Sequence, residues 1–161
     1  MPTATTVNQE KIQTLNIQQE IAIAAPIETA WEAVLEQMGP KSEMPDGKPF
    51  PFKLEAWPGG RLYRDLGNSA GHLWGHVQVI KPPTLLEIWG PMMMSFPAVN
   101  HLQYRLTPEG TGTRLALVHK SIGLIAKEHR EGMQAGWSYK LNRIRDLAAR
   151  RKTNAKKESQ R

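Results

Sequence analysis

Cysteine is absent from the 161-residue chain, which excludes disulfide bonds and thiolate metal sites. No hydrophobic run reaches the roughly 18 residues that a membrane span needs. The N-terminal segment, MPTATTVNQEKIQ, lacks the apolar stretch of a secretory signal peptide. Together these absences predict a soluble, unexported protein, which we expect in the cytoplasm.

The net charge of +6 comes mostly from the end of the chain. Residues 150–161, RRKTNAKKESQR, hold six basic residues and one acidic residue, so they carry +5 and the remaining chain carries +1. A short basic tail after a helix is typical of a solvated chain end. No zinc-finger, Walker or dinucleotide-binding motif accompanies it. We therefore expect no specific nucleic-acid partner, while weak attraction of the tail to nucleic acid or anionic lipid stays open.

The hydrophobic pattern predicts a strand, a helix, a series of strands and a long final helix. Isoleucines alternate within residues 14–25 as in a half-buried strand. Residues 26–39 carry apolar side chains at steps of three and four, which is typical of an amphipathic helix. Residues 40–51 contain four of the twelve prolines and predict a loop or a broken short helix. Strand-like runs separated by turn residues follow, and residues 124–150 form a second helical stripe.

This order favours one α+β domain in which an antiparallel meander curves around the last helix. Within the chain we expect a flexible N-terminal arm at residues 1–13, the folded domain at residues 14–150, and a basic C-terminal tail at residues 151–161. A curved sheet that holds one helix leaves space for a cavity between the two.

A resemblance to a known superfamily is carried by five segments in the order IAAPIETAWEAV, WPGGRLYRD, GHVQVIKPPTLLEIW, YRLTPEGTGTRLALVHKS and GMQAGWSYKLNRI. Together they resemble the START-like helix-grip superfamily, which includes lipid-transfer START domains, birch-pollen-allergen-like proteins and polyketide cyclases. The chain is most similar to the branch named for the activator of the heat-shock chaperone ATPase, over about residues 15–148. The resemblance implies a curved antiparallel sheet of about six or seven strands wrapped around a long C-terminal helix. It also places His119 at a recurrent structural position near the end of the last strand.

His72 and His76 have the spacing of a metal chelate on a helix. Gly71, Gly75 and the valine-rich run that follows favour a strand instead, on which the two side chains would lie about 13 Å apart. Zinc needs both ring nitrogens at about 2 Å. We therefore predict no metal site here, and nothing else in the sequence calls for a cofactor.

The same strand has two faces. The simpler interpretation assigns the core face to Leu73, Gly75, Val77 and Val79. His72, Trp74, His76 and Gln78 would then point outward, with Trp74 as a surface or dimer contact. The opposite orientation, in which the histidines face a cavity and take part in acid–base chemistry, stays open.

Two further features point to an apolar site. Gly132 and Gly136 lie in the last helix, where each costs about 1 kcal/mol relative to alanine. The two glycines have three possible explanations: close approach of another segment, room for a ligand, or plain tolerance of glycine in the helix. Met92, Met93 and Met94 suit either core packing or an adaptable apolar surface, and three consecutive residues cannot all face inward on a strand.

The sequence contains no visible catalytic constellation. Glu55, Asp65 and Glu87 lie on different predicted strands, and no Ser-His-Asp order or G-x-S-x-G motif occurs. We therefore predict binding of a hydrophobic or aromatic small molecule, or a lipid, in a cavity between the sheet and the C-terminal helix. The expected wall residues are Trp57, Tyr63, Trp89, Met93, Tyr104, Met133 and Trp137.

Two alternatives belong to other functional classes. One is an enzyme similar to polyketide cyclases or aromatases, which would use the same cavity and would need an inward-facing histidine, tyrosine or acid. The other is a chaperone-interacting module, which would use an exposed face such as the methionine segment. The sequence leaves the oligomeric state open, including a homodimer.

Overall fold

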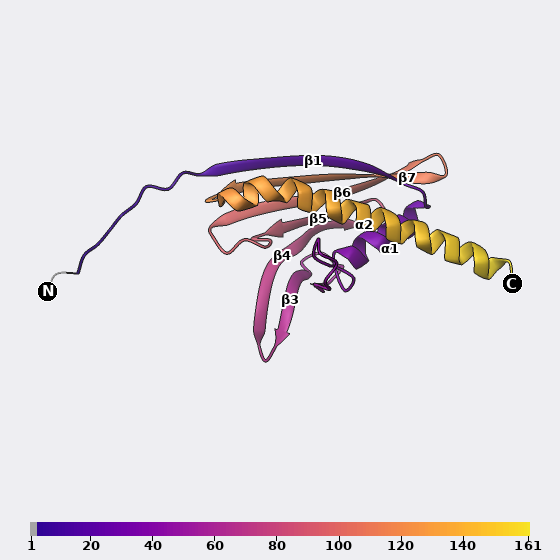
Figure 1. Ribbon diagram of the computed structural model, residues 1–161, viewed down its shortest axis with the longest axis horizontal. Helices are drawn as coiled ribbons and strands as arrows, with labels where there is room; N and C mark the ends of the chain where they lie inside the picture. Colours follow the sequence, from indigo (N-terminus) through magenta and orange to yellow (C-terminus); the bar gives the residue numbers. More distant parts are fainter. Residues whose placement is uncertain (1–2) are drawn as a thin grey trace.

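Seven antiparallel strands form a single sheet in the computed structural model, which describes residues 3–161 (Figure 1). The strands are β1 (Gln13–Ile23), β2 (Lys53–Leu54), β3 (Arg61–Gly67), β4 (Ala70–Lys81), β5 (Leu85–Gly90), β6 (Ala98–Glu109) and β7 (Gly112–Gly123). The helices of this part of the chain are α1 (Ile27–Gln37), between β1 and β2, and α2 (Lys127–Ser159), after β7. The predicted α+β helix-grip architecture is confirmed.

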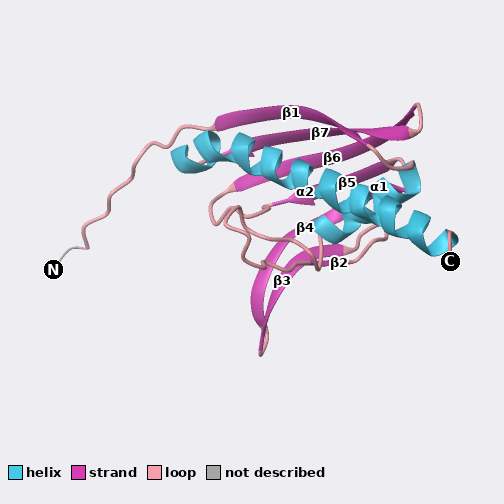
Figure 2. Cartoon of the chain, turned by 45° about the vertical axis from the view of Figure 1, so that its right-hand side comes forward, coloured by secondary structure: helices cyan, strands magenta, loops and turns pink. Residues whose placement is uncertain are grey.

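The strand order across the sheet is β1-β7-β6-β5-β4-β3-β2. Strands β2 to β7 follow one another because short turns join antiparallel neighbours. Strand β1 instead occupies the far edge and pairs with β7, with Ile17 opposite His119. Figure 2 shows α2 crossing one face of the sheet, while the β3–β4 hairpin extends beyond the helix. The sheet therefore closes around the helix from β1 on one side to β3 on the other.

Helix α1 begins directly after Pro26, whose fixed φ suits a helix start and whose carbonyl accepts a hydrogen bond from the Ala30 N–H at 3.0 Å. The predicted amphipathic stripe is buried, with Trp31 and Val34 at its centre. The helix ends at Gln37, before Gly39 and Pro40. It leads straight into the loop of residues 38–52, called loop 38–52 below.

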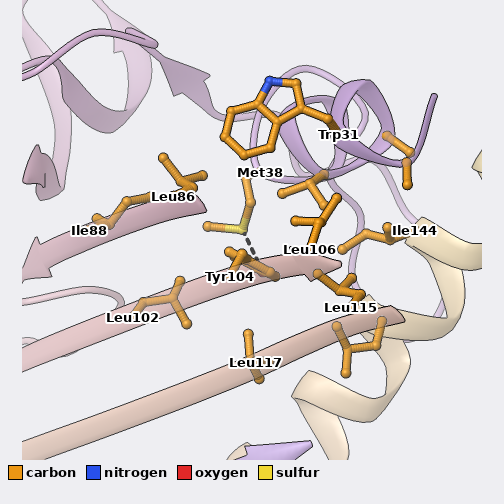
Figure 3. Packing of buried hydrophobic residues seen from close by; sticks show 14 of the residues in the cluster. Trp31, Met38, Leu86, Ile88, Leu102, Tyr104, Leu106, Leu115, Leu117 and Ile144 are labelled. Atoms are coloured by element: carbon orange, nitrogen blue, oxygen red, sulfur yellow. Dashed lines mark hydrogen bonds between the residues drawn. The ribbon is translucent and has the colours of Figure 1, made fainter. Parts of the chain in front are cut away.

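The hydrophobic core lies between the inner face of the sheet and both helices (Figure 3). Strands β5, β6 and β7 contribute alternate residues, and the fully buried ones are Leu86, Ile88, Leu102, Tyr104, Leu115 and Leu117. Helix α2 adds only Leu141, Ile144 and Ala148 as buried residues, all from its middle and C-terminal part. The Tyr104 hydroxyl donates a hydrogen bond to Met38 Sδ at 3.1 Å, and burial raises the pKa of this phenol.

Strand β4 switches the face that it presents to the core at Trp74. On β3, Leu62 and Tyr63 are consecutive, but their partners on β4 are Gly75 and Leu73, so Trp74 is the extra residue of a β-bulge. As a result Trp74 is only 6% exposed whereas Leu73 is 50% exposed. The interpretation of Trp74 as an outward residue and of Leu73 as a core residue was wrong, because regular alternation does not continue through a bulge.

The two ends of the chain differ from each other. Residues 3–12 have no regular secondary structure and are exposed, and β1 begins at Gln13. The basic tail was expected to follow the last helix, but α2 continues to Ser159 with mostly exposed side chains. Lysine, arginine and alanine are good helix formers, which accounts for this extension. Neither helix within residues 3–161 combines the length and the apolar composition needed to cross a bilayer.

Candidate ligand-binding cavity

A cavity of about 380 Å³ lies between the N-terminal half of α2, loop 38–52 and the inner face of β3, β4 and β7. The apolar part of its lining comes from Met38, Met44, Pro45, Phe50, Phe52, Leu62, Trp74, Met92, Met93, Gly132, Met133, Gly136 and Trp137. Polar side chains at its margins belong to Ser42, Glu43, His119, Glu128, His129, Tyr139 and Lys140. Its size is in the lower part of the range of about 300–1,000 Å³ for small-molecule sites.

The two halves of α2 have different environments. Between Leu141 and Ala148 the helix packs on the core, whereas Gly132 and Gly136 border the cavity. A Cβ atom added to either glycine would have no heavy atom within 4 Å. Close approach of another segment therefore does not explain these glycines. They leave open space beside the cavity, at a cost in helix propensity of about 1 kcal/mol each.

An aromatic cluster forms the wall opposite α2. The ring of Phe52 packs edge-on against Trp74 with centroids 4.5 Å apart, and Phe50 stacks on Trp74 at 5.9 Å. The bulge in β4 turns Trp74 inward, and loop 38–52 supplies both phenylalanines. Offset and edge-to-face aromatic contacts stabilise such clusters by about 0.5–1.5 kcal/mol per pair. These ring contacts hold the aromatic wall in place in the unliganded protein.

His119 lies in the cavity wall with both ring nitrogens engaged. The Trp137 indole N–H donates to His119 Nδ1 at 2.9 Å, so this nitrogen must be the acceptor. The Nε2–H then donates to Asn100 Oδ1 at 2.8 Å, and the Asn100 amide donates in turn to the carbonyl oxygens of Gly90 and Pro91 at 3.2 Å each. Burial lowers the pKa of His119 to about 4, so the ring is neutral near pH 7. This histidine presents no free proton acceptor to the cavity.

The other polar end of the cavity joins α2 to loop 38–52. The ammonium of Lys140 donates to the carbonyl of Gln37 at 2.9 Å and to Ser42 Oγ at 2.6 Å. Two further residues of α2 bind the loop through Glu43. Its Oε1 accepts a hydrogen bond from the Tyr139 hydroxyl at 2.7 Å and pairs with Arg143 Nε at 2.8 Å. These contacts hold the loop against the helix and close the cavity on that side.

Three of the seven expected wall residues line the cavity: Met93, Met133 and Trp137. Trp137 also contacts the ring of His119 edge-on at 5.5 Å, which fixes its indole in the wall. In the methionine segment, Met92 and Met94 are buried while Met93 is 49% exposed. Met93 therefore lies where the lining meets solvent.

The other four lie elsewhere. Trp57 is in the turn before β3 and is 57% exposed. Tyr63 follows the inward-facing Leu62, so it points to the outer face, where the Arg61 guanidinium lies 4.5 Å from its ring centroid. Trp89 follows the buried Ile88 and is 47% exposed. Tyr104 is fully buried behind Met38 and Trp137 and is not part of the lining.

His72 and His76 lie on opposite faces because of the bulge. His72 stacks with Trp74 at 6.1 Å between ring centroids, near the cavity side of β4. His76 lies on the outer face, where its Nδ1 is 3.1 Å from the Gly59 carbonyl oxygen and its ring is 6.2 Å from that of Trp89. Within residues 3–161 no group of three potential ligands is arranged to hold a metal ion.

Sequence reasoning missed Phe50, Phe52 and Lys140 as lining residues, and it favoured an outward position for Trp74. For Lys140 a signal was present, since it lies seven residues after Met133 and four after Gly136 and therefore shares their helical face. The phenylalanines belong to a proline-rich loop, whose path no periodicity specifies. Trp74 was hidden by the bulge.

The sequence of residues 24–149 matches the family described as Activator of Hsp90 ATPase homolog 1-like protein. The chain belongs to this family. The match covers the chain from the end of β1 to the buried middle of α2, and so includes every element that borders the cavity. No curated protein matches the chain significantly in sequence.

Solved structures show the same fold at low sequence identity. A protein from Rhizobium leguminosarum superimposes with a TM-score of 0.66 at 15% identity, over 89% of this chain and 99% of that one. A protein from Chromobacterium violaceum gives a TM-score of 0.61 at 19% identity, over 83% and 96% of the two chains. The di-domain ARO/CYC protein StfQ from the steffimycin biosynthetic pathway gives 0.61 at 12% identity, over 87% of this chain and 52% of that one. These likenesses show that the chain has the helix-grip fold, and that it spans about half of StfQ.

Proposed function

We propose that this protein binds an apolar small molecule or a lipid in the cavity between α2, loop 38–52 and the sheet. The observation that carries the proposal is a cavity of about 380 Å³ with an almost continuous apolar lining, beside which Gly132 and Gly136 leave open space. Burial of apolar surface would drive binding. A ligand that buries about 250 Å² of apolar area gains about 6 kcal/mol, equivalent to a Kd in the tens of micromolar.

The test uses N-phenyl-1-naphthylamine, a neutral dye whose fluorescence rises in apolar surroundings. The wild-type protein should give a saturable increase. Gly136→Trp should reduce the affinity at least tenfold, because the indole would fill space next to the lining. Ala135→Trp is the matched control, since Ala135 is exposed, adjacent in the same helix and outside the lining. Binding that survives Gly136→Trp unchanged would exclude this cavity as the site.

A cyclase-like enzyme that uses the same cavity is the second candidate. The likeness in fold to StfQ supports it, and so does the presence of His119 in the lining. Against it, both nitrogens of His119 are hydrogen-bonded to Trp137 and Asn100, so acid–base chemistry would first require Trp137 to move. Mass spectrometry of a ligand before and after incubation with the protein separates the two functions, since only an enzyme changes the ligand's mass or fragmentation pattern.

The chaperone-interacting alternative needs an exposed face, and the methionine segment was the suggested example. Met92 is 8% exposed and Met94 is 5% exposed, which leaves Met93 alone at the surface of this segment. One exposed methionine is a small area for a partner. The cavity therefore remains the better-supported site.

A further inference from the structure

The most unusual charged group in the molecule is the ammonium of Lys140. It borders the apolar cavity, and its two hydrogen-bond acceptors, the Gln37 carbonyl and Ser42 Oγ, are both neutral. An ammonium has three N–H donors, so one remains for a further acceptor. Within residues 3–161 no carboxylate forms a salt bridge with Lys140.

The charged groups around Lys140 leave an excess of positive charge. Glu43 is the nearest acid that affects it, but this carboxylate is already bound by Arg143 at 2.8 Å and by the Tyr139 hydroxyl at 2.7 Å. On the sheet side His119 is neutral, and the ring of Phe52 lies 5.2 Å from the ammonium. Two cations and one carboxylate thus meet at this end of the cavity.

Tying the loop to the helix does not by itself require a charge. Any neutral donor could satisfy the Gln37 carbonyl and Ser42, whereas a partly buried ammonium without an anion is costly to desolvate. Burial accordingly lowers the pKa of Lys140 to about 8. A negatively charged ligand group would supply the missing partner.

We propose that Lys140 anchors the anionic end of the ligand, so that the bound molecule is an amphipathic carboxylate with an apolar body. This inference rests on the proposed function and specifies its ligand class. The lining residues of α2 run from Lys140 past Gly136 and Gly132 to Glu128, a span of about 18 Å at 1.5 Å per residue. The carboxylate binds at Lys140, and the apolar body lies along the helix past the two glycines.

Decanoate and 1-decanol make a matched pair of probes, because they share a chain and differ only in the charged end. Each is titrated against the protein loaded with N-phenyl-1-naphthylamine at pH 7, and displacement gives its affinity. The variants are Lys140→Met, which keeps length and apolar volume, and Lys140→Gln, which keeps a hydrogen-bond donor. Lys81→Met is the control, because Lys81 is exposed at the end of β4, lies outside the lining, and its substitution removes the same charge.

Both Lys140 variants should weaken decanoate ten- to hundredfold, the range expected for one charge-assisted hydrogen bond. They should change the affinity for 1-decanol and for the dye by less than about threefold. Lys81→Met should change none of these. Retained dye binding shows that a variant is folded. If Lys140→Met does not fold, Lys140→Gln alone gives the comparison of decanoate with 1-decanol.

Wild-type protein gives an independent readout through pH. Decanoate stays ionised from pH 7 to 9, and His119 is neutral throughout. Tyr139, bound to Glu43, has a raised pKa and also keeps its proton. Deprotonation of Lys140 in the unliganded protein should then weaken decanoate about tenfold between pH 7 and 9, while 1-decanol binds equally well at both.

The outcomes separate the two proposals. If the dye and 1-decanol bind and Gly136→Trp reduces both, but decanoate is insensitive to Lys140→Met and to pH, then the anionic anchor is wrong and the cavity function stands. If the dye does not bind, or binds equally well to Gly136→Trp, the proposed cavity function is wrong. The proposal that Lys140 binds the anionic end of the ligand is then wrong as well. Selective loss of decanoate in both Lys140 variants supports the anchor.

Discussion

Acidification should destabilise this protein through a single buried histidine. His119 is 1% exposed, and its Nδ1 accepts the indole N–H of Trp137. A proton added to Nδ1 would face that N–H donor, so the charged ring would lose a hydrogen bond at a buried position. Burial lowers the pKa of His119 from its usual value of about 6.5 to about 4.

The size of the effect follows from proton linkage. Because the folded-state pKa of His119 is depressed, its contribution to stability is present above pH 6.5 and is lost as the pH falls toward 4. With pKa values of about 6.5 unfolded and about 4 folded, the free energy of unfolding should decrease by about 2.5 kcal/mol between pH 7.5 and 4.5. The steepest slope, near pH 5.25, is about 1.2 kcal/mol per pH unit.

Urea unfolding followed by circular dichroism at pH 7.5, 6.5, 5.5 and 4.5 measures this slope. The window stops at pH 4.5 because carboxylates with lowered pKa, such as Glu55 at about 2, titrate below it. His119→Gln should lower stability at pH 7.5 and remove most of the slope, whereas His72→Gln, at an exposed position, should keep it. Equal slopes in wild type and His119→Gln would refute the assignment.

Three further changes test the packing and the limits of the site. Ile144→Ala empties a fully buried position on α2 and should lower the free energy of unfolding by about 2–5 kcal/mol in urea melts. Gln37→Met should raise the free energy of unfolding by about 1–3 kcal/mol, because the Gln37 amide is buried without a hydrogen-bond partner among residues 3–161. An unchanged midpoint of urea unfolding would contradict this. Trp57→Ala should leave the dye Kd unchanged, since Trp57 is exposed outside the lining; a weaker Kd would extend the site to this turn.

Most of the fold could be predicted from the sequence because its elements are periodic. Alternation in β1 and the stripe of α1 are visible in the order of apolar residues, and the structure has both where expected. The helical spacing of Met133 and Trp137 likewise put them on the inner face of α2. Regular elements of this kind determine which face a side chain occupies.

The failures have two causes, which are loss of regularity at the bulge and in loop 38–52, and the assignment of two aromatic residues to the wrong face of a regular strand. A bulge at Trp74 reverses the faces of β4 within one residue, and the alternation of apolar and polar residues does not specify it. Trp89 and Tyr63 each follow a residue whose side chain points inward. Because successive side chains of a strand point to opposite faces, both aromatic rings point outward. The wall formed by loop 38–52 depends on tertiary contacts to α2, such as that of Glu43 with Arg143, which a single sequence does not display.

The most direct measurement of the central claim is a crystal structure of the protein with decanoate. The account predicts continuous density for the alkyl chain between α2 and Trp74, alongside Gly136, with the carboxylate within hydrogen-bond distance of Lys140 Nζ. Decanoate bound only outside this cavity, or a helix that has closed onto the sheet and left no space, would contradict it.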